Sequence, residues 1–338
     1  MKVLVAPFLV ATWLVFVHRA FAAEASTNLE TERYASRCQS RDRYRHNQEQ
    51  GTDLLGVKQS WNPHAPDNQA SNVLRSAYLD RLLLAVPGTP AGVHNLRLDK
   101  GWLTPSSAGP DDAPGKTNLI GLVLQARSSA GPTEVAICGA EPADHSRMVW
   151  YHIKIWNPVA QAWENPCVAT MAVRDPRALA VNGVWDETGA HRDSPAQFTF
   201  ACENGAIAKC VQWGYEPWES RDGQSLAKVH QACTRMARAD YCGNGRSHTL
   251  DGTSIDIYDT RGILTPETGT LFEADWAPDG ATCINQTRRG DPVDTILREC
   301  PGRFRVGTEI DLGDGDRCAV RRTSARPSAG LVRNRLYR

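Results

Sequence analysis

Alternating apolar and polar residues predict strands in the first half of the chain. The run 147–158 is the clearest, because its side chains alternate along most of its length before an Asn-Pro break. Two aliphatic, β-branched stretches, 118–128 and 133–139, flank the turn dipeptide Gly131-Pro132. They predict two neighbouring antiparallel strands.

Weaker patterns place further strands and one loop. The Pro-, Gly- and Ser-rich segment 103–116 predicts a loop, whereas 70–86 fits either a helix or a strand. The segment 247–259 predicts a hairpin, because an Asp-Gly turn lies between two strand-like arms. Strands are also expected around 271–276 and 304–310.

The segment 198–218 predicts another hairpin. Two β-rich arms flank Asn204-Gly205, and Asn-Gly is the strongest short signal for a tight turn. Cys202 and Cys210 lie on opposite arms of this expected hairpin. A disulfide between them would close only a short loop and would stabilise the fold little.

Residues 224–238 have the periodicity of one amphipathic helix. The apolar positions recur at intervals of three and four residues, and Gly243 can end the helix. Lys228, Gln231, Arg235 and Arg238 are expected on the opposite face. The side chains on the apolar face are those of Leu226, Val229, His230, Cys233 and Ala237.

The N-terminus predicts export. Residues 3–17 are uncharged and are followed by the small-x-small pattern Ala20-Phe21-Ala22, which is typical of a cleaved signal peptide. A membrane anchor is the alternative, but a spanning helix needs ~20 apolar residues and Pro7 interrupts this shorter run. We therefore expect an extracytoplasmic protein, secreted or periplasmic, with no transmembrane anchor after cleavage.

The cysteines predict a cross-linked fold. Ten cysteines, an even number in an exported chain, favour complete pairing into disulfides. Five bridges at ~2–4 kcal/mol each would match the stability of a whole domain. Spacing leaves the connectivity open among Cys38, Cys138, Cys167, Cys202, Cys210, Cys233, Cys242, Cys283, Cys300 and Cys318.

These patterns predict an α+β fold that is mainly antiparallel β and disulfide-rich, with one short helix near 224–238. Charge is balanced overall, with 38 basic and 38 acidic residues, yet residues 317–338 hold seven arginines and no acid. Such a tail is either solvated, folded back on the acidic body, or bound to an anionic surface. The expected segments are a signal peptide at 1–22, a charged leader at 23–50, a β-rich region at 51–193, a second domain at 194–320 and an Arg-rich tail at 321–338.

Four motifs carry a family resemblance. The segments RADYCGNG (238–245), HQACTRM (230–236), KCVQWGYEPW (209–218) and FEADWAPDGATC (272–283) together resemble the ADYC-domain proteins. That exported bacterial family is named for the tetrapeptide at 239–242. The resemblance implies an extracytoplasmic, cysteine-rich domain centred on 198–283, and it implies no reaction.

His230, Cys233 and Cys242 admit three interpretations. Cys233 could be a thiolate nucleophile with His230 as its base, but this requires an unpaired sulfur. The three residues could hold zinc, although structural zinc sites usually use close-spaced C-x-x-C pairs, which this chain lacks. The favoured interpretation is structural, with both cysteines bridged and His230 packed in the core.

Two further groups are candidates for binding. Trp213, Tyr215 and Trp218 could form an exposed stacking platform for a sugar or peptide, or could be core residues. Oxygen ligands for calcium could come from the Gly-rich loop around 311–316, although its spacing differs from an EF-hand and an acidic turn is the simpler interpretation. The acids of that loop are Asp311, Asp314 and Asp316.

Function is the least determined property of the sequence. It contains no G-x-S-x-G, H-E-x-x-H, Walker or G-x-G-x-x-G motif, and no cofactor is expected. Aromatic residues do not interleave with the basic tail, so nucleic acid is not an expected partner. The leading hypothesis is a non-catalytic secreted or cell-surface module that binds a carbohydrate or protein. A secreted hydrolase using His230 and Cys233, or a carboxylate pair, is the alternative.

Overall fold

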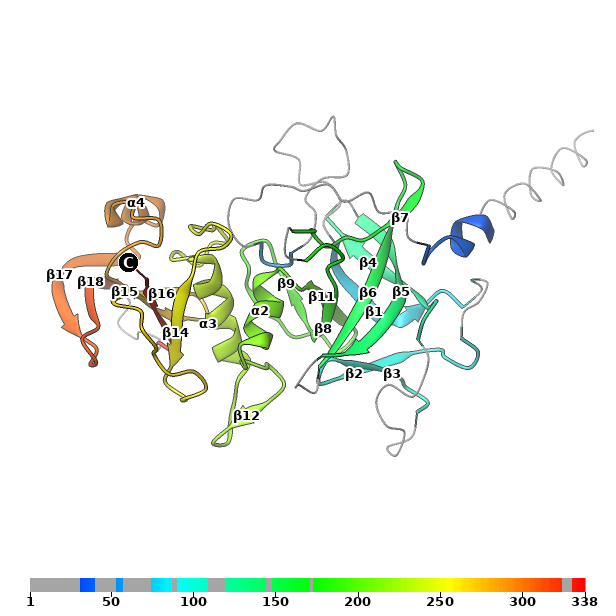
Figure 1. Cartoon of the computed structure of the whole chain (residues 1–338), viewed down its shortest axis with the longest axis horizontal. Helices are drawn as coiled ribbons and strands as arrows, with labels where there is room; N and C mark the ends of the chain where they lie inside the picture. The colour runs from blue at the N-terminus through cyan, green and yellow to red at the C-terminus, as the bar shows by residue number, and fades with distance from the viewer. Residues whose placement is uncertain are drawn as a thin grey trace, which may run out of the picture.

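The protein is mostly antiparallel β, as expected, with two sheets separated by a pair of helices (Figure 1). No helix among the described residues is long and apolar enough to cross a lipid bilayer. The expected signal peptide and most of the leader lie outside the described residues. The computed structural model describes residues 31–39, 53–56, 74–84, 86, 90–108, 119–129, 131–143, 148–170, 173–323 and 330–337.

The first sheet has the strand order β5-β4-β1-β11-β8-β6-β7 and closes on itself, because β5 also pairs with β6. Inward-facing aliphatic and aromatic side chains such as Leu124, Ile153 and Phe200 fill its interior. Within the ambiguous segment 70–86, residues 74–82 form a strand of this sheet. The strands are β1 (Leu74–Leu82), β4 (Val123–Ser128), β5 (Gly131–Pro142), β6 (Val149–Asn157), β7 (Ala162–Glu164), β8 (Ala178–Asn182) and β11 (Gln197–Cys202).

The second sheet has six strands in the order β14-β19-β15-β16-β18-β17. Its inner face packs against helix α3 around Trp276 and Val332. The strands are β14 (Ile255–Asp259), β15 (Leu271–Ala277), β16 (Gly280–Ile284), β17 (Phe304–Asp311), β18 (Arg317–Arg322) and β19 (Val332–Leu336).

Helices α2 (Ala206–Gln212) and α3 (Ala227–Arg238) pack on each other between the two sheets (Figure 1). Helix α4 (Val293–Glu299) lies beside the second sheet, and residues 31–35 of the leader are also helical, so α3 is not the only helix. The remaining strands form three hairpins: β2 (Leu96–Asp99) with β3 (Trp102–Pro105), β9 (Val184–Trp185) with β10 (His191–Arg192), and β12 (Ser220–Arg221) with β13 (Gln224–Ser225).

The hairpin expected at 198–218 is wrong. Strand β11 enters a turn and continues as helix α2 instead of returning as a strand. Gly205 is needed for close approach, since a Cβ there would lie 2.5 Å from the carbonyl carbon of Leu55. The Asn-Gly pair therefore marks a crossing of two backbone segments, which local sequence does not distinguish from a tight turn.

The hairpin expected at 247–259 is half correct. Its second arm is β14, but residues 247–250 form no strand. The backbone of His248 and the hydroxyl of Ser247 both donate to the carbonyl of Arg238, each at 3.0 Å. This segment therefore caps the end of α3 and is not available for strand pairing.

Five disulfides pair all ten cysteines, which confirms the expected cross-linking. The bridge considered between Cys202 and Cys210 does not form. Cys202 is bonded to Cys167, and Cys210 is bonded to Cys233. The pairs are Cys38–Cys138, Cys167–Cys202, Cys210–Cys233, Cys242–Cys300 and Cys283–Cys318.

The segment expected as an Arg-rich tail contributes an interior strand to the second sheet. Strand β19 pairs with β14 on one side and with β15 on the other. Its alternate residues Val332 and Asn334 are fully buried, while Arg333 and Arg335 lie on the opposite face. Residues 330–337 therefore belong to the fold and are not a solvated extension.

Candidate functional site

The tetrapeptide at 239–242 ends helix α3, which stops at Ala239 and not at Gly243. Ala239 adopts a left-handed conformation with φ 52°, and its amide donates back to Met236. Gly243 also has a positive φ, but its role is close packing, because a Cβ there would lie 1.9 Å from the carbonyl oxygen of Asp279. The helix thus ends at Arg238, as the periodicity predicts, but its C-cap is Ala239 and not the glycine.

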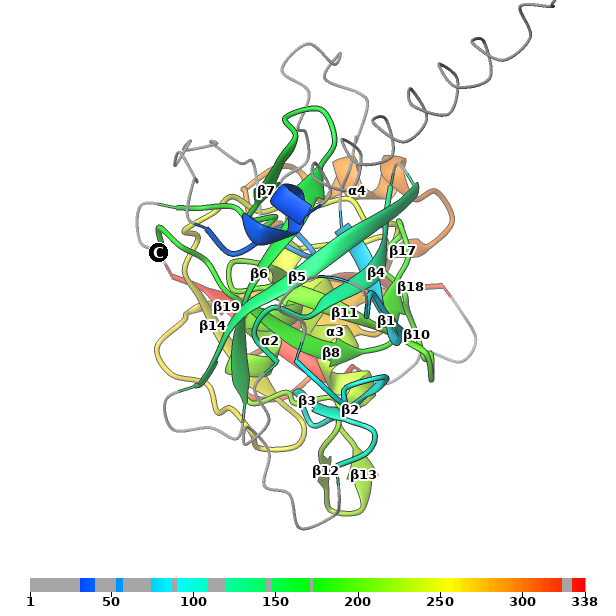
Figure 2. The same cartoon turned by 90° about the vertical axis from the view of Figure 1, so that its right-hand side faces the viewer.

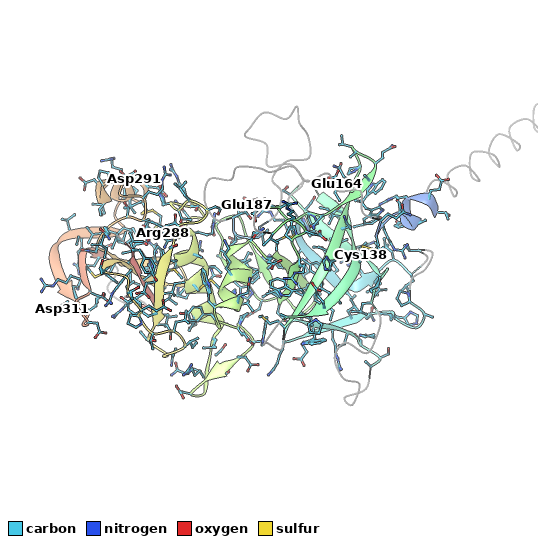
Figure 3. All side chains as sticks on the ribbon, in the orientation of Figure 1. Cys138, Glu164, Glu187, Arg288, Asp291 and Asp311 are labelled. Carbon is cyan, nitrogen blue, oxygen red and sulfur yellow. A yellow bond between two sulfur atoms is a disulfide. The ribbon has the colours of Figure 1, made fainter. Side chains whose placement is uncertain are left out.

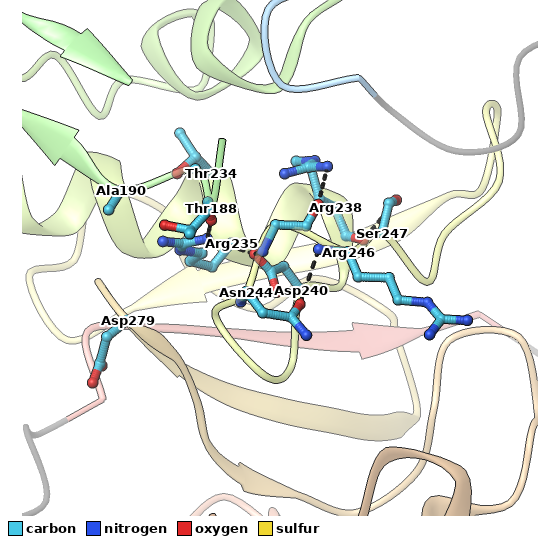
Figure 4. Close-up of polar contacts among 12 residues, drawn as sticks. Thr188, Ala190, Thr234, Arg235, Arg238, Asp240, Asn244, Arg246, Ser247 and Asp279 are labelled. Carbon is cyan, nitrogen blue, oxygen red and sulfur yellow. Dashed lines mark hydrogen bonds and ion pairs between the residues drawn. The ribbon is translucent and has the colours of Figure 1, made fainter. Parts of the chain in front are cut away.

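Asp240, the second residue of the tetrapeptide, is fully buried and organises the turn (Figure 4). Its Oδ2 accepts from Arg235 at 2.5 Å and from the amide of Gly245 at 2.9 Å, and its Oδ1 accepts from the amide of Asn244 at 3.1 Å. Arg235 also donates to the carbonyl of Thr188. The carboxylate therefore joins the helix, the following turn and the β9–β10 loop.

Tyr241 is at the centre of a buried polar network. Its hydroxyl donates to Glu273 Oε1 at 2.8 Å and accepts from the amide of Arg288 at 2.7 Å. Glu273 also accepts from Arg288 Nε at 3.0 Å and from Asn334 at 2.6 Å. Asn334 in turn accepts from the indole of Trp276 at 2.9 Å. Burial raises the pKa of Tyr241 well above its ordinary value, so the hydroxyl stays protonated.

The guanidinium of Arg288 completes the helix end. It donates to the carbonyls of Met236 and Ala237, at 2.8 and 3.0 Å, which are among the carbonyls that a helix leaves without an internal partner. Cys242, the last residue of the tetrapeptide, is bridged to Cys300 just after α4. All four residues of the tetrapeptide therefore hold elements together, and none faces a cavity found in the described part of the chain.

His230 and Cys233 lie together on α3 but lack the chemistry of a catalytic pair. The sulfur of Cys233 is bonded to that of Cys210, so no thiolate is present. His230 is 1 % exposed, and its Nε2 contacts the carbonyl of Ile207 at 3.1 Å. Burial lowers its pKa to about 4, so it is neutral at physiological pH. Helix α3 is enclosed, because Gln231 and Arg235, expected on an open face, are also buried.

The three aromatic candidates do not form one patch. Tyr215 is fully buried, with its hydroxyl 3.1 Å from Asp259 Oδ2. Trp218 packs against the core of the first sheet, and its indole donates to Glu216 at 2.9 Å. Trp213 packs on the core of the second sheet but remains partly exposed. Of the three, Trp213 lines a surface depression.

That depression is an open groove of about 600 Å³ along the edge strand β14. Trp213, at the end of α2, lines it together with Tyr337, which follows β19 and is 42 % exposed. The groove has aromatic, aliphatic and hydroxyl side chains and no charged group in its lining. The lining residues are Trp213, Thr253, Ser254, Ile255, Ile257 and Tyr337.

The acids considered for calcium do not converge. Asp316 is 1 % exposed and accepts from Arg335 at 3.0 Å, with Tyr258 as a second donor. Asp311 is at the end of β17, far from the first sheet (Figure 3), and accepts from the amide of Gly313. Within the described residues, no group of three or more His, Cys, Asp or Glu side chains is placed to hold a metal ion. The acidic loop therefore binds the arginines of β19.

Sequence reasoning missed a charged cluster on the first sheet. Arg177 donates to Glu141 at 2.7 Å and to Glu203 at 2.8 Å, and His152 lies 3.4 Å from Glu141. The hydrogen bond from Arg177 lowers the pKa of Glu141, whereas a glycosidase acid needs a raised pKa. No sequence signal would have found this cluster, because its members come from separate strands and loops.

Comparison with known proteins identifies one family. The model of the ADYC domain matches residues 116–290, just over half of the chain. The match runs from before β4 to after β16 and therefore includes much of the first sheet, earlier than the expected domain start at 194. No curated protein and no solved structure matches the chain. The tetrapeptide that led to the resemblance is the buried junction described above, and the chain belongs to the ADYC domain family.

Proposed function

We propose that this protein is a non-catalytic, extracytoplasmic module that binds a neutral carbohydrate chain in the groove along β14. The observation that supports this function is the groove lining, in which two aromatic rings occur with hydroxyl and aliphatic groups and without charge. The apolar C–H face of a sugar ring packs on an aromatic ring, and hydroxyl groups such as those of Thr253 and Ser254 match sugar hydroxyls.

The shape and position of the groove favour an extended ligand. It is open to solvent beside the edge strand β14, so an extended chain has access to it. Both rings are set by the fold: Trp213 packs on the core with part of its surface, and Tyr337 directly follows the interior strand β19. Such pre-positioned rings lose little conformational entropy on binding.

Two further observations support a non-catalytic role and a location outside the cytoplasm. The six lining residues include no carboxylate, histidine or cysteine that could act as an acid, base or nucleophile. Complete pairing of ten cysteines is typical of proteins that fold in an oxidising compartment outside the cytoplasm. The signal peptide expected at residues 1–22 would direct the chain to such a compartment.

Calorimetric titration with neutral hexasaccharides tests the proposal. We expect cello-, xylo-, malto- or chitohexaose to bind, with Tyr337→Ala and Trp213→Ala each weakening binding at least tenfold. Tyr337→Phe retains the ring and should bind nearly as well as the unaltered protein. The matched control is Val159→Ala, a side chain 72 % exposed in the turn between β6 and β7 of the other sheet, which should have no effect.

Three results would contradict the proposal. One is the absence of binding to all four sugars, and another is binding that Tyr337→Ala leaves unchanged. The third is release of shorter sugars during incubation, because it would indicate a hydrolase. Binding of an extended peptide instead of sugars would assign the β14 edge to strand addition.

A further inference from the structure

A second pocket, of about 360 Å³, lies on the outer surface of the closed sheet. Strands β1, β4 and β5 form its floor, and side chains alternate along β4 so that Leu124 and Ala126 point inward. Gln125 and Arg127 therefore face outward into the pocket. The pocket is separate from the groove on β14, which belongs to the other sheet.

Two arginines give this pocket unbalanced positive charge. The guanidinium of Arg81 lies over the ring of Tyr78, 4.1 Å from its centroid, which holds the flexible side chain against the pocket wall. Arg127 lies near the end of β4 and is exposed. Neither arginine forms an ion pair with any residue in the described part of the chain. By contrast, Arg235, Arg288 and Arg335 are all paired with carboxylates.

The acid in the pocket wall is already neutralised by the leader. Glu134 on β5 is bound by Arg33, and the hydroxyl of Tyr34 lies 3.2 Å from its Oε1. The leader helix at 31–35 lies across the outer face of the sheet (Figure 2), and the Cys38–Cys138 disulfide holds it there. The ring of Trp156 further orients Arg33, whose guanidinium lies 4.3 Å from its centroid. Hence Arg81 and Arg127 set the charge of the pocket.

We infer that this pocket binds a small, hydroxylated molecule through an oxyanion group held between Arg81 and Arg127. Guanidinium groups recognise carboxylate and phosphate oxygens by paired, charge-assisted hydrogen bonds. The amide of Gln125 and the hydroxyl of Thr133, also in the lining, offer partners for hydroxyl groups of the same ligand. The inference is independent of the neutral-sugar groove.

Matched sugars test the inference with the full-length protein. Calorimetric titration with glucose 6-phosphate, glucuronate and glucose compares a phosphate, a carboxylate and no charge on closely related rings. We expect one or both anions to bind and glucose not to bind at the same concentration. The stronger of the two anions identifies whether the natural oxyanion is a phosphate or a carboxylate.

Substitutions separate a specific pocket from general charge attraction. Arg81→Gln and Arg127→Gln should each weaken anion binding about tenfold or more, the loss typical of a charged hydrogen bond. Arg305→Gln removes the same charge from an exposed position on β17 and should leave binding unchanged. Arg33→Gln should also weaken anion binding, because it leaves the negative charge of Glu134 in the pocket wall.

Circular dichroism of each variant checks that the fold is retained. Equal losses in Arg81→Gln and Arg305→Gln would overturn the inference, as would glucose binding as tightly as the anions. Failure of both anions to bind the folded, unaltered protein would also overturn it. None of these results affects the hexasaccharide experiment, because the two sites share no residue.

Discussion

Tyr241→Phe removes one hydroxyl from the buried junction and leaves the ring in place. Two groups then lose a partner: the Oε1 of Glu273, which is fully buried, and the backbone amide of Arg288. A buried polar group without a partner costs about 1–3 kcal/mol. Glu273 keeps its hydrogen bonds to Arg288 and Asn334, so it loses only part of its hydrogen bonding. We therefore expect the free energy of unfolding to fall by about 2–4 kcal/mol.

Equilibrium unfolding in guanidinium chloride, with the disulfides intact, measures this change. Tryptophan fluorescence and circular dichroism should report one shifted midpoint with an unchanged slope. Tyr337→Phe is the control, since that ring is exposed, and it should change the free energy of unfolding by less than about 0.5 kcal/mol. A loss below about 0.5 kcal/mol for Tyr241→Phe would refute the view that the hydroxyl satisfies buried groups.

Further substitutions test the disulfides, the buried histidine and the last strand. The double change Cys210→Ala and Cys233→Ala should reduce the free energy of unfolding by about 3 kcal/mol, as measured by chemical denaturation, because the bridge closes a loop with a sequence separation of 23. The folded pKa of His230, about 4, lies below its ordinary value of 6.5, so its contribution to stability is present above pH 6.5 and is lost as pH falls towards 4. The loss of stability between pH 7 and 4 should thus be smaller in His230→Gln, and an identical pH dependence would contradict this. Asp316→Asn should destabilise the fold by about 3–5 kcal/mol in the same denaturation assay, because Arg335 loses a buried partner; matched Asp311→Asn should have little effect.

The periodicity of apolar residues correctly predicted those strands and helices whose buried residues recur at regular intervals. The alternation in 147–158 became β6, and the apolar repeat in 224–238 became α3, because each element packs one or both faces against a core. The end of α3 at Arg238 matches the expected bound, but the helix starts at Ala227 and not at 224, because Gln224 and Ser225 pair with β12 as strand β13. Periodicity does not report such contacts.

The predictions failed where a charged residue or a glycine is compatible with two different structures. Arg333 and Arg335 were assigned to a tail because of their charge, yet their alternation with Val332 and Asn334 is a strand pattern. Their partner, Asp316, was considered separately as a calcium ligand, since sequence does not show that the two segments meet. The groove was missed for a similar reason: Trp213 and Tyr337 are 124 positions apart in the sequence.

The position of β19 has a consequence for biogenesis. When a ribosome or an export channel delivers the polypeptide from its N-terminus, β14 and β15 emerge many residues before the strand that must insert between them. Until residues 332–336 arrive, both neighbours present unsatisfied edges, and Glu273 and Trp276 lack the amide of Asn334. The second sheet therefore matures only after its final strand is released, whereas the first sheet is complete by residue 202.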